Sequence, residues 1–168
     1  MGIIIKKPET EEEIKGKAFV HWASWQEAYP GIVAQEYLQR LTLEKCEQIA
    51  FNWQDGIFIA KDEERVIGFV GYGHREEDPP YVGEVFALYV LSEYYGTGVG
   101  KSLMEAALDK LASYPEICLW TLKDNKRAIG FYKKTGFVPD GTEKTNKVIE
   151  AGEIRMVLKR RTDPVLSV

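Results

Sequence analysis

The sequence predicts an α+β fold in which helices cover both faces of a central mixed, mostly antiparallel sheet. Three observations support this prediction. Apolar residues recur at helical spacing through residues 10–30. Two apolar segments, 57–60 and 66–72, flank a short charged turn, as in an antiparallel hairpin. From residue 82 onward, strand and helix patterns alternate, which is typical of parallel pairing. Together they indicate three layers.

The N-terminal part reads as one strand and three helices. An apolar strand at 2–7 precedes a capping box, with Thr10 as the N-cap and Glu13 three residues later. The first helix should end at Pro30 and Gly31. Its apolar positions are Ile14, Ala18, Trp22, Trp25 and Tyr29. Shorter helical patterns follow at 35–41 and 43–51.

The C-terminal part alternates strands and helices after the predicted hairpin. The expected strands are 82–90, 117–121, a strand beginning at 137–139, and 154–158. The expected helices are 100–112 and 125–134. A chain of 168 residues without repeats or linkers suits a single domain spanning residues 1–168.

Composition and charge exclude several functional classes. A net charge of −4 argues against a nucleic-acid-binding protein, which usually carries a basic stripe. No apolar run is long enough for a membrane span. Cys46 and Cys118 form neither a metal cluster nor a disulfide framework. The sequence therefore predicts a cytoplasmic protein without a metal, a membrane anchor or a nucleic-acid partner.

A glycine loop between the strand at 82–90 and the following helix is the most specific signal. Glycines let successive N–H groups converge on one anion, and the helix start adds its positive dipole end. A Walker A loop would need glycine where Tyr95 stands. A dinucleotide fingerprint would need its third glycine where Lys101 stands. Both nucleotide readings remain open, although each requires a departure from its motif.

A third reading fits the glycine spacing unchanged. Gly98, Val99 and Gly100 match the second half of Gln/Arg-x-x-Gly-x-Gly/Ala, in which Tyr95 replaces Gln or Arg. A second motif, Asn-x-x-Ala-x-x-Phe-Tyr-x-x-x-Gly-Phe, matches at every named position. Its residues are Asn125, Ala128, Phe131, Tyr132, Gly136 and Phe137. Together these segments resemble motifs A and B of the GNAT superfamily of acetyl-CoA-dependent N-acetyltransferases, and the resemblance covers residues 57–160 well.

The resemblance implies a three-layer GNAT-like fold with acetyl-CoA as co-substrate. It implies that the loop holds the coenzyme pyrophosphate through main-chain amides. The loop residues concerned are Tyr95, Gly96, Thr97, Gly98, Val99, Gly100 and Lys101. It further implies that the strand carrying Leu88, Tyr89 and Val90 splays from its neighbour and pairs with the pantetheine arm. Asn125 would bind the same arm, although its side chain also suits a helix N-cap.

Two residues are candidates for proton transfer. Glu84 lies in an apolar strand, where burial should raise its pKa and make it a general base. Alternation predicts that it shares a face with Phe86, Leu88 and Val90, and the alternative is a solvent-facing glutamate. Tyr132 shares a helix face with Asn125. The resemblance implies that it protonates the departing thiolate, whereas the alternative is a core aromatic residue.

The predicted activity is N-acetylation by direct attack of an amine on acetyl-CoA in a ternary complex. The acceptor is a small-molecule amine or a protein amino group, and the resemblance implies that a homodimer can form. In such folds the first helices wall the acceptor site, so Trp25 or Tyr29 could contact the substrate. Two alternatives remain: a non-catalytic acyl-CoA sensor on the same fold and a P-loop-like nucleotide binder.

Overall fold

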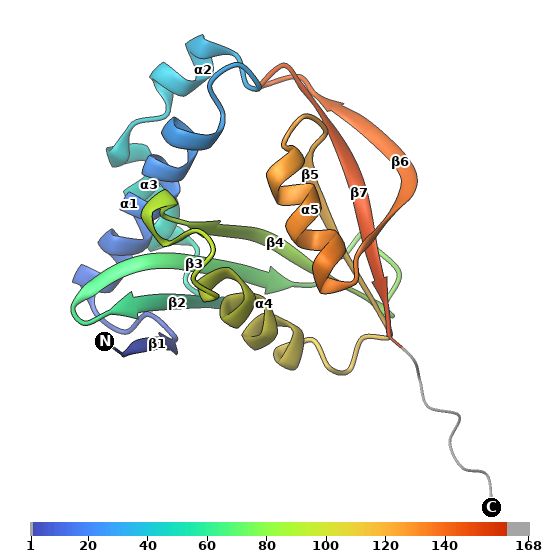
Figure 1. Ribbon diagram of the computed structural model, residues 1–168, viewed down its shortest axis with the longest axis horizontal. Helices are drawn as coiled ribbons and strands as arrows, with labels where there is room; N and C mark the ends of the chain where they lie inside the picture. The colour runs from blue at the N-terminus through green and yellow to red at the C-terminus, as the bar shows by residue number, and fades with distance from the viewer. Residues whose placement is uncertain (1, 161–168) are drawn as a thin grey trace, which may run out of the picture.

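The protein, seen in a computed structural model that describes residues 2–160, is built around one seven-stranded sheet. The strand order is β1-β2-β3-β4-β5-β7-β6, and only β4 and β5 run parallel (Figure 1). The strands are β1 (Ile3–Lys6), β2 (Ile57–Asp62), β3 (Arg65–Gly73), β4 (Val82–Val90), β5 (Glu116–Leu122), β6 (Val138–Asn146) and β7 (Ala151–Lys159). The prediction of a mixed, mostly antiparallel sheet is confirmed.

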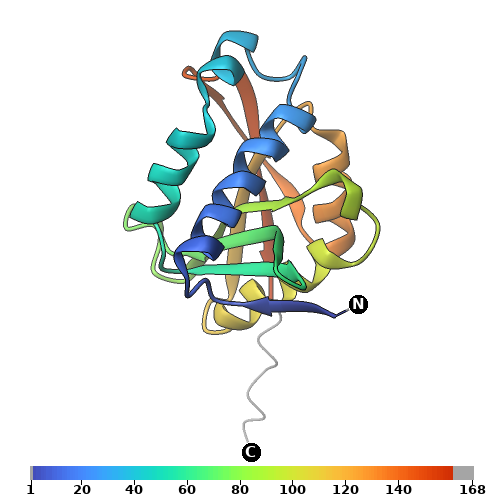
Figure 2. The same cartoon turned by 90° about the vertical axis from the view of Figure 1, so that its left-hand side faces the viewer.

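Five α-helices accompany the sheet in the described residues, and they cover both of its faces (Figures 1 and 2). They are α1 (Glu11–Ala28), α2 (Gln35–Arg40), α3 (Leu43–Asn52), α4 (Val99–Lys110) and α5 (Lys126–Thr135). Neighbouring residues of β3 show the two faces. Gly68 lies against Leu103 of α4, whereas Phe69 lies under Lys17 of α1. This alternation along a strand gives the three predicted layers.

The predicted capping box fixes the start of α1. The Thr10 hydroxyl accepts the Glu13 N–H, and the Glu13 carboxylate accepts the Thr10 N–H. That carboxylate is almost fully buried and pairs with Lys6 of β1 at 2.8 Å and Lys61 of β2 at 3.1 Å. These contacts fasten α1 to the edge of the sheet, and α1 in turn extends toward the centre of β4.

The last two strands are longer than the sequence pattern suggested, and β7, expected at 154–158, runs from Ala151 to Lys159. The strand expected to begin at 137–139 runs as β6 from Val138 to Asn146, with an irregular register between Pro139 and Glu143 opposite β7. Nearly all its side chains are exposed, so it lacks the apolar alternation by which a strand is recognised. Residues 1 and 161–168 of the predicted domain lie outside the described residues.

None of the helices within residues 2–160 combines the length and the apolar character needed to cross a lipid bilayer.

Candidate active site

The strands β4 and β5 part in the middle of the sheet. Residues 82–84 of β4 pair with residues 116–118 of β5. Within the described residues, no further pair forms along the rest of these two strands. The Leu91 N–H donates to the Ile67 carbonyl of β3 at 2.9 Å. By antiparallel alternation, the main-chain groups of Leu88 and Val90 then point away from β3, into the gap. Those of Tyr89 point toward β3. The gap therefore offers an unpaired strand edge.

A bulge in β4 changes which side chains share a face. Ala87 pairs with Gly71 and Val85 pairs with Tyr72, which leaves Phe86 as an extra residue. Phe86 accordingly packs against Trp53, on the α1 side of the sheet, while Val90 lies beside Gly100 of α4. The prediction that Glu84 shares a face with Leu88 and Val90 is therefore wrong, because the bulge resets the alternation. Its part that concerns Phe86 agrees with the structure, since the Arg75 guanidinium contacts both the Phe86 ring and the Glu84 carboxylate.

The glycine loop presents a set of unpaired amides at the mouth of this gap. Gly96 and Gly98 have φ of 76° and 90°, which only glycine adopts without strain. Gly98 is the N-cap of α4 and offers no side-chain cap, and the first helical bond runs from Ser102 N–H to its carbonyl. In residues 2–160, the N–H groups of Gly98, Val99, Gly100 and Lys101 donate to no protein acceptor. Four free donors at a helix start suit an anionic group such as a diphosphate.

Positive charge at this loop comes from an unexpected residue. The Lys101 side chain is largely exposed and lies 3.9 Å from Glu105. The Arg127 guanidinium of α5 instead stacks on the Tyr95 ring, 3.6 Å from its centroid. Tyr95 occupies the motif position that usually carries Gln or Arg, so the stack places a guanidinium next to that position.

One cavity of about 480 Å³ connects the gap and the loop. Its lining includes most of the predicted site residues, namely Glu84, Leu88, Tyr89, Val90, Tyr95, Gly96, Gly98, Gly100, Lys101, Asn125 and Tyr132. Two predicted residues do not line it. The Val99 side chain is buried in the core, and the Thr97 hydroxyl donates to the Tyr94 carbonyl at 2.6 Å.

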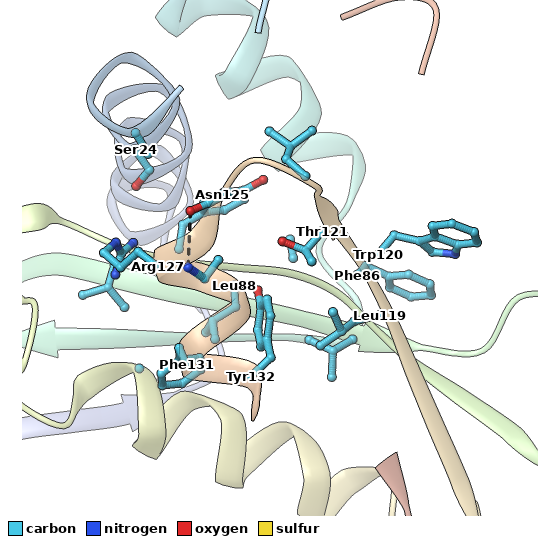
Figure 3. A pocket seen from close by; sticks show the side chains of 18 of the residues that line it. Ser24, Phe86, Leu88, Leu119, Trp120, Thr121, Asn125, Arg127, Phe131 and Tyr132 are labelled. Atoms are coloured by element: carbon cyan, nitrogen blue, oxygen red, sulfur yellow. Dashed lines mark hydrogen bonds between the residues drawn. The ribbon is translucent and has the colours of Figure 1, made fainter. Parts of the chain in front are cut away.

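Asn125 and Tyr132 project from α5 toward β4 and β5 (Figure 3). Asn125 caps α5, since its Oδ1 accepts the Ala128 N–H at 3.2 Å, which leaves the amide nitrogen available. Tyr132 lies beside Leu88 and Leu119 along the gap (Figure 3). Burial raises the pKa of Tyr132 well above its usual range, so the phenol keeps its proton at neutral pH.

Glu84 is 2% exposed and faces the cavity at the point where β4 and β5 part. The Arg75 Nε donates to both of its carboxylate oxygens at 2.9 and 3.0 Å, and the Cys118 thiol lies 3.6 Å from one of them. Burial raises the pKa of Glu84, and the guanidinium and the thiol offset part of that rise. The carboxylate is thus a buried proton acceptor held by one arginine.

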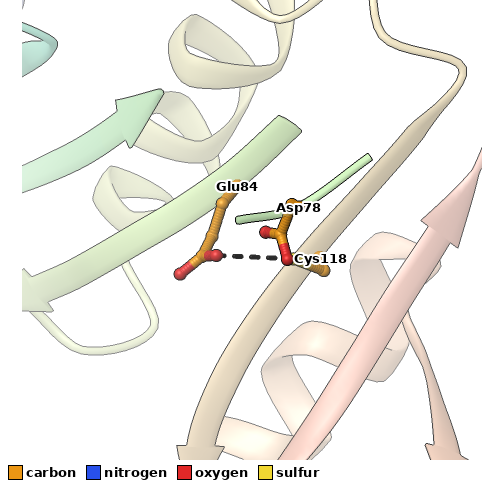
Figure 4. Close-up of side chains that lie close together, drawn as sticks. All are labelled: Asp78, Glu84 and Cys118. Atoms are coloured by element: carbon orange, nitrogen blue, oxygen red, sulfur yellow. Dashed lines mark hydrogen bonds between the residues drawn. The ribbon is translucent and has the colours of Figure 1, made fainter. Parts of the chain in front are cut away.

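Asp78, Glu84 and Cys118 place ligand atoms within 4.8 Å of one another (Figure 4). Burial and the adjacent Glu84 carboxylate raise the pKa of the Cys118 thiol to about 12. The guanidinium of Arg75 also occupies Glu84 already. The cluster therefore has the spacing of a metal site, and one of its three groups is already engaged by a guanidinium.

Several cavity residues were not predicted from the sequence. Arg75 lies in the loop before β4, Ser24 on α1, Arg127 on α5, and Trp120 on β5. Nothing in the sequence around Arg75, Ser24 or Trp120 indicates a binding site, because only the fold brings these residues to the gap. Only Arg127 had a sequence signal, because it falls inside the second motif.

Comparisons with known proteins agree with this geometry. The acetyltransferase (GNAT) family matches residues 19–137. The uncharacterized N-acetyltransferase YuaI of Bacillus subtilis is 32% identical over 130 residues, which is 73% of either chain. Mycothiol acetyltransferase of Nocardia farcinica is 37% identical over 98 residues, which is 54% of this chain but only 32% of that relative.

A solved structure shows the same fold. The PaiA N-acetyltransferase of Thermoplasma acidophilum, in complex with coenzyme A, superimposes with a TM-score of 0.73 at 24% identity, covering 95% of this chain and 99% of that one. Because the family match spans more than half of the sequence and includes the glycine loop and the helix carrying Tyr132, the chain belongs to the acetyltransferase (GNAT) family and is an N-acetyltransferase by family.

Proposed function

We propose that this protein transfers an acetyl group from acetyl-CoA to a primary amine, by direct attack within a ternary complex. The observation that carries the proposal is the parting of β4 and β5 beneath the unpaired N–H groups of residues 98–101, which we call the amide cradle. A diphosphate on the N–H groups of residues 98–101 places the pantetheine arm along Leu88 and Val90, where it adds to the free strand edge.

Three groups of this chain would assist the transfer. The amine nitrogen attacks the thioester carbonyl, and its proton passes to Glu84, directly or through a water molecule. The Leu88 N–H donates to the carbonyl oxygen as negative charge develops there. As the carbon–sulfur bond breaks, the Tyr132 phenol gives its proton to the thiolate. No covalent enzyme intermediate is needed.

Coenzyme binding separates this proposal from nucleotide binding. Ligands that bind only the folded state raise the melting temperature. Coenzyme A and acetyl-CoA should therefore stabilise the protein, whereas ATP or GTP with Mg²⁺ at equal concentration should not. Stabilisation by the nucleotides alone would refute the proposal.

Turnover separates an enzyme from an acyl-CoA sensor. We expect free thiol to appear when acetyl-CoA is mixed with an accepting amine, and the acetylated amine to appear in equal amount by mass spectrometry. Small-molecule amines and peptide amino groups belong in the same panel, since the acceptor is either a small amine or a protein amino group.

A further inference from the structure

The guanidinium that holds Glu84 also rests on an aromatic ring. The guanidinium carbon of Arg75 lies 5.1 Å from the centroid of the Phe86 ring, while Nε contacts both carboxylate oxygens of Glu84 at 2.9 and 3.0 Å. A guanidinium is attracted by the negative charge of an aromatic face. Arg75 therefore has two partners, a carboxylate and a ring, and the reaction described above uses only the first.

The bulge in β4 leaves Phe86 without a partner on β3, and its ring lies over Gly73. The residues before and after Phe86 pair with consecutive residues of β3. A Cβ added to Gly73 would lie 2.9 Å from Cε2 of the ring, closer than such atoms approach in proteins. Gly73 is also the residue of β3 that pairs with Glu84. The ring therefore fills the space that a side chain opposite Glu84 would otherwise occupy.

A second ring supports Phe86 from the end of α3. Trp53 packs edge-on against Phe86, with ring centroids 6.0 Å apart and planes at 66°. It lies over Gly71, where an added Cβ would come within 2.7 Å of the indole. Gly71 and Gly73 are two residues apart on β3 and so share a face. Two glycines thus make room for two rings, and we call Phe86 and Trp53 the aromatic platform.

Arg75 depends on this platform because little else fixes its side chain. It lies in the loop between β3 and β4, and its side chain is 47% exposed. Within residues 2–160, Glu84 is the one carboxylate at ion-pair distance from it. Immobilising a long, exposed side chain costs conformational entropy. A ring that already restricts the guanidinium reduces the freedom that the contact with Glu84 must remove.

We propose that Phe86 is a positioning residue, whose ring, seated over Gly73 and backed by Trp53, holds the Arg75 guanidinium against the Glu84 carboxylate. Phe86 acts through Arg75 and not on the reacting atoms. Its importance for catalysis rests on the proposed function, in which Glu84 accepts the amine proton. Without the ring, the guanidinium would spend part of its time in solvent, and Glu84 would be a buried carboxylate without a cation.

Removal of the ring has two effects on the pKa of Glu84, and they differ in sign. A weaker contact with the guanidinium raises this pKa, because the ionised form loses its partner. An opened space beside the carboxylate lowers it, because water then solvates the ionised form. A rise in Phe86→Leu is therefore specific to the contact with Arg75. The other ionisable groups at Glu84 are Asp78 and Cys118, and every variant below keeps both.

The test is an NMR titration of the side-chain carboxyl carbon of Glu84, identified as the signal that Glu84→Gln lacks. We expect the midpoint to move up by about 0.5 pH unit in Phe86→Leu, the size of a partly exposed cation–π contact, and further in Arg75→Gln. Phe86→Tyr keeps an aromatic face and should titrate like wild type. Gly73→Ala, whose Cβ displaces the ring, should move the midpoint in the same direction as Phe86→Leu.

Phe58→Leu is the matched control, since Phe58 is another half-buried aromatic residue of the sheet and stacks on Tyr72. It should leave the midpoint in place. The double variant Phe86→Leu/Arg75→Gln should titrate like Arg75→Gln, because the ring acts only through the guanidinium. Melting curves show whether each variant folds, and Gly73→Ala decides the question if Phe86→Leu does not. An unchanged or lower midpoint in the folded variants would overturn the proposal, as would a further rise in the double variant.

The titration needs no turnover, so its outcome is separate from that of the proposed reaction. If the midpoints move as expected and no amine is acetylated, the proposed function fails and the platform stands. If amines are acetylated and Phe86→Leu titrates like wild type, the reaction stands and the platform fails. If both proposals hold, the acidic limb of kcat/KM moves to higher pH in Phe86→Leu and Gly73→Ala, as in Arg75→Gln.

Discussion

The Arg75 Nε contacts both carboxylate oxygens of Glu84, at 2.9 and 3.0 Å. Arg75 is about half exposed, whereas the Glu84 side chain is only 3% exposed. A buried carboxylate tends to take up a proton, and a guanidinium in this position favours the ionised form. Arg75 therefore positions the proposed base and limits the rise in its pKa, while Asp78 acts in the opposite direction.

Arg75→Gln should move the acidic limb of the kcat/KM profile to higher pH. A general base works only when deprotonated, so activity rises with pH through its pKa, and removing the guanidinium raises that pKa. Initial rates measured from pH 5 to 9 test this. Arg40→Gln, which alters an exposed arginine on α2, should leave the profile in place. If the acidic limb lies at the same pH in Arg75→Gln and wild type, ionisation of Glu84 does not determine its position.

Glu84→Gln and Tyr132→Phe should each lose turnover while keeping coenzyme A affinity. General acid and base groups typically contribute about 10²- to 10⁴-fold, so we expect kcat to fall at least 100-fold in each variant. Calorimetric dissociation constants for coenzyme A should stay within about threefold, because neither group contacts the phosphates. The exposed Tyr81→Phe is the control. Unchanged kcat in both variants would favour the sensor.

Gly98→Ala should weaken coenzyme A binding, and Gly141→Ala should not. Both glycines have φ near +90°, and an added Cβ meets nothing within 4 Å at either position. Both changes should therefore cost a similar backbone strain of about 1 kcal/mol in stability. Only Gly98 lies in the cradle, so calorimetry should show a loss of affinity in that variant alone. Equal affinities for the two variants would contradict the cradle.

Arg127→Leu should weaken coenzyme A binding at least tenfold and reduce its dependence on salt. The guanidinium stacked on Tyr95 is the cation brought to the motif position that lacks Gln or Arg, and a charge-assisted contact to phosphate is worth roughly 1.5–3 kcal/mol. Lys126→Leu, one residue earlier and exposed, is the matched control. Calorimetric titrations at low and high salt measure how the affinity for coenzyme A depends on salt concentration. An equal salt dependence in Arg127→Leu and wild type would argue against a phosphate contact.

Glu13→Gln should destabilise the fold by on the order of 3 kcal/mol, since it leaves Lys6 and Lys61 without their buried partner. Hydrogen bonds to these lysines and to main-chain amides outweigh burial and hold the pKa of Glu13 at about 2, below its usual 4.5. The stabilisation is thus fully present above pH 4.5 and is lost as pH falls toward 2.

Chemical denaturation of wild type and Glu13→Gln at pH 7 and pH 3 measures this difference in stability. The gap between the two proteins should shrink at pH 3. The exposed Glu12→Gln serves as control and should change stability little at either pH.

The sequence predicted the parts of the fold that depend on residues close together in the chain. The capping box at Thr10 and Glu13 defined the start of α1, and the order of glycine loop and helix defined the start of α4. Apolar periodicity identified β2 to β5 because their side chains are largely buried. The exposed β6 carries no such pattern, and its full length emerged only from its pairing with β7.

The site was harder to predict where it depends on contacts between distant residues. The bulge at Phe86 arises from how β3 and β4 pair, so alternation along β4 alone wrongly assigned Leu88 and Val90 to the face of Glu84. The contact of Arg75 with Glu84 depends on how the loop before β4 folds back. Ser24 gave no signal, since a serine within a helix is usually satisfied by its own backbone.

The central claim is that β4 and β5 are held apart to receive a thioester arm. A crystal structure of the complex with coenzyme A tests it most directly. We expect the diphosphate on the N–H groups of residues 98–101 and the pantetheine arm hydrogen-bonded to the main chain of Leu88 and Val90. Coenzyme A bound elsewhere, or β4 and β5 hydrogen-bonded to each other beyond Glu84, would contradict it.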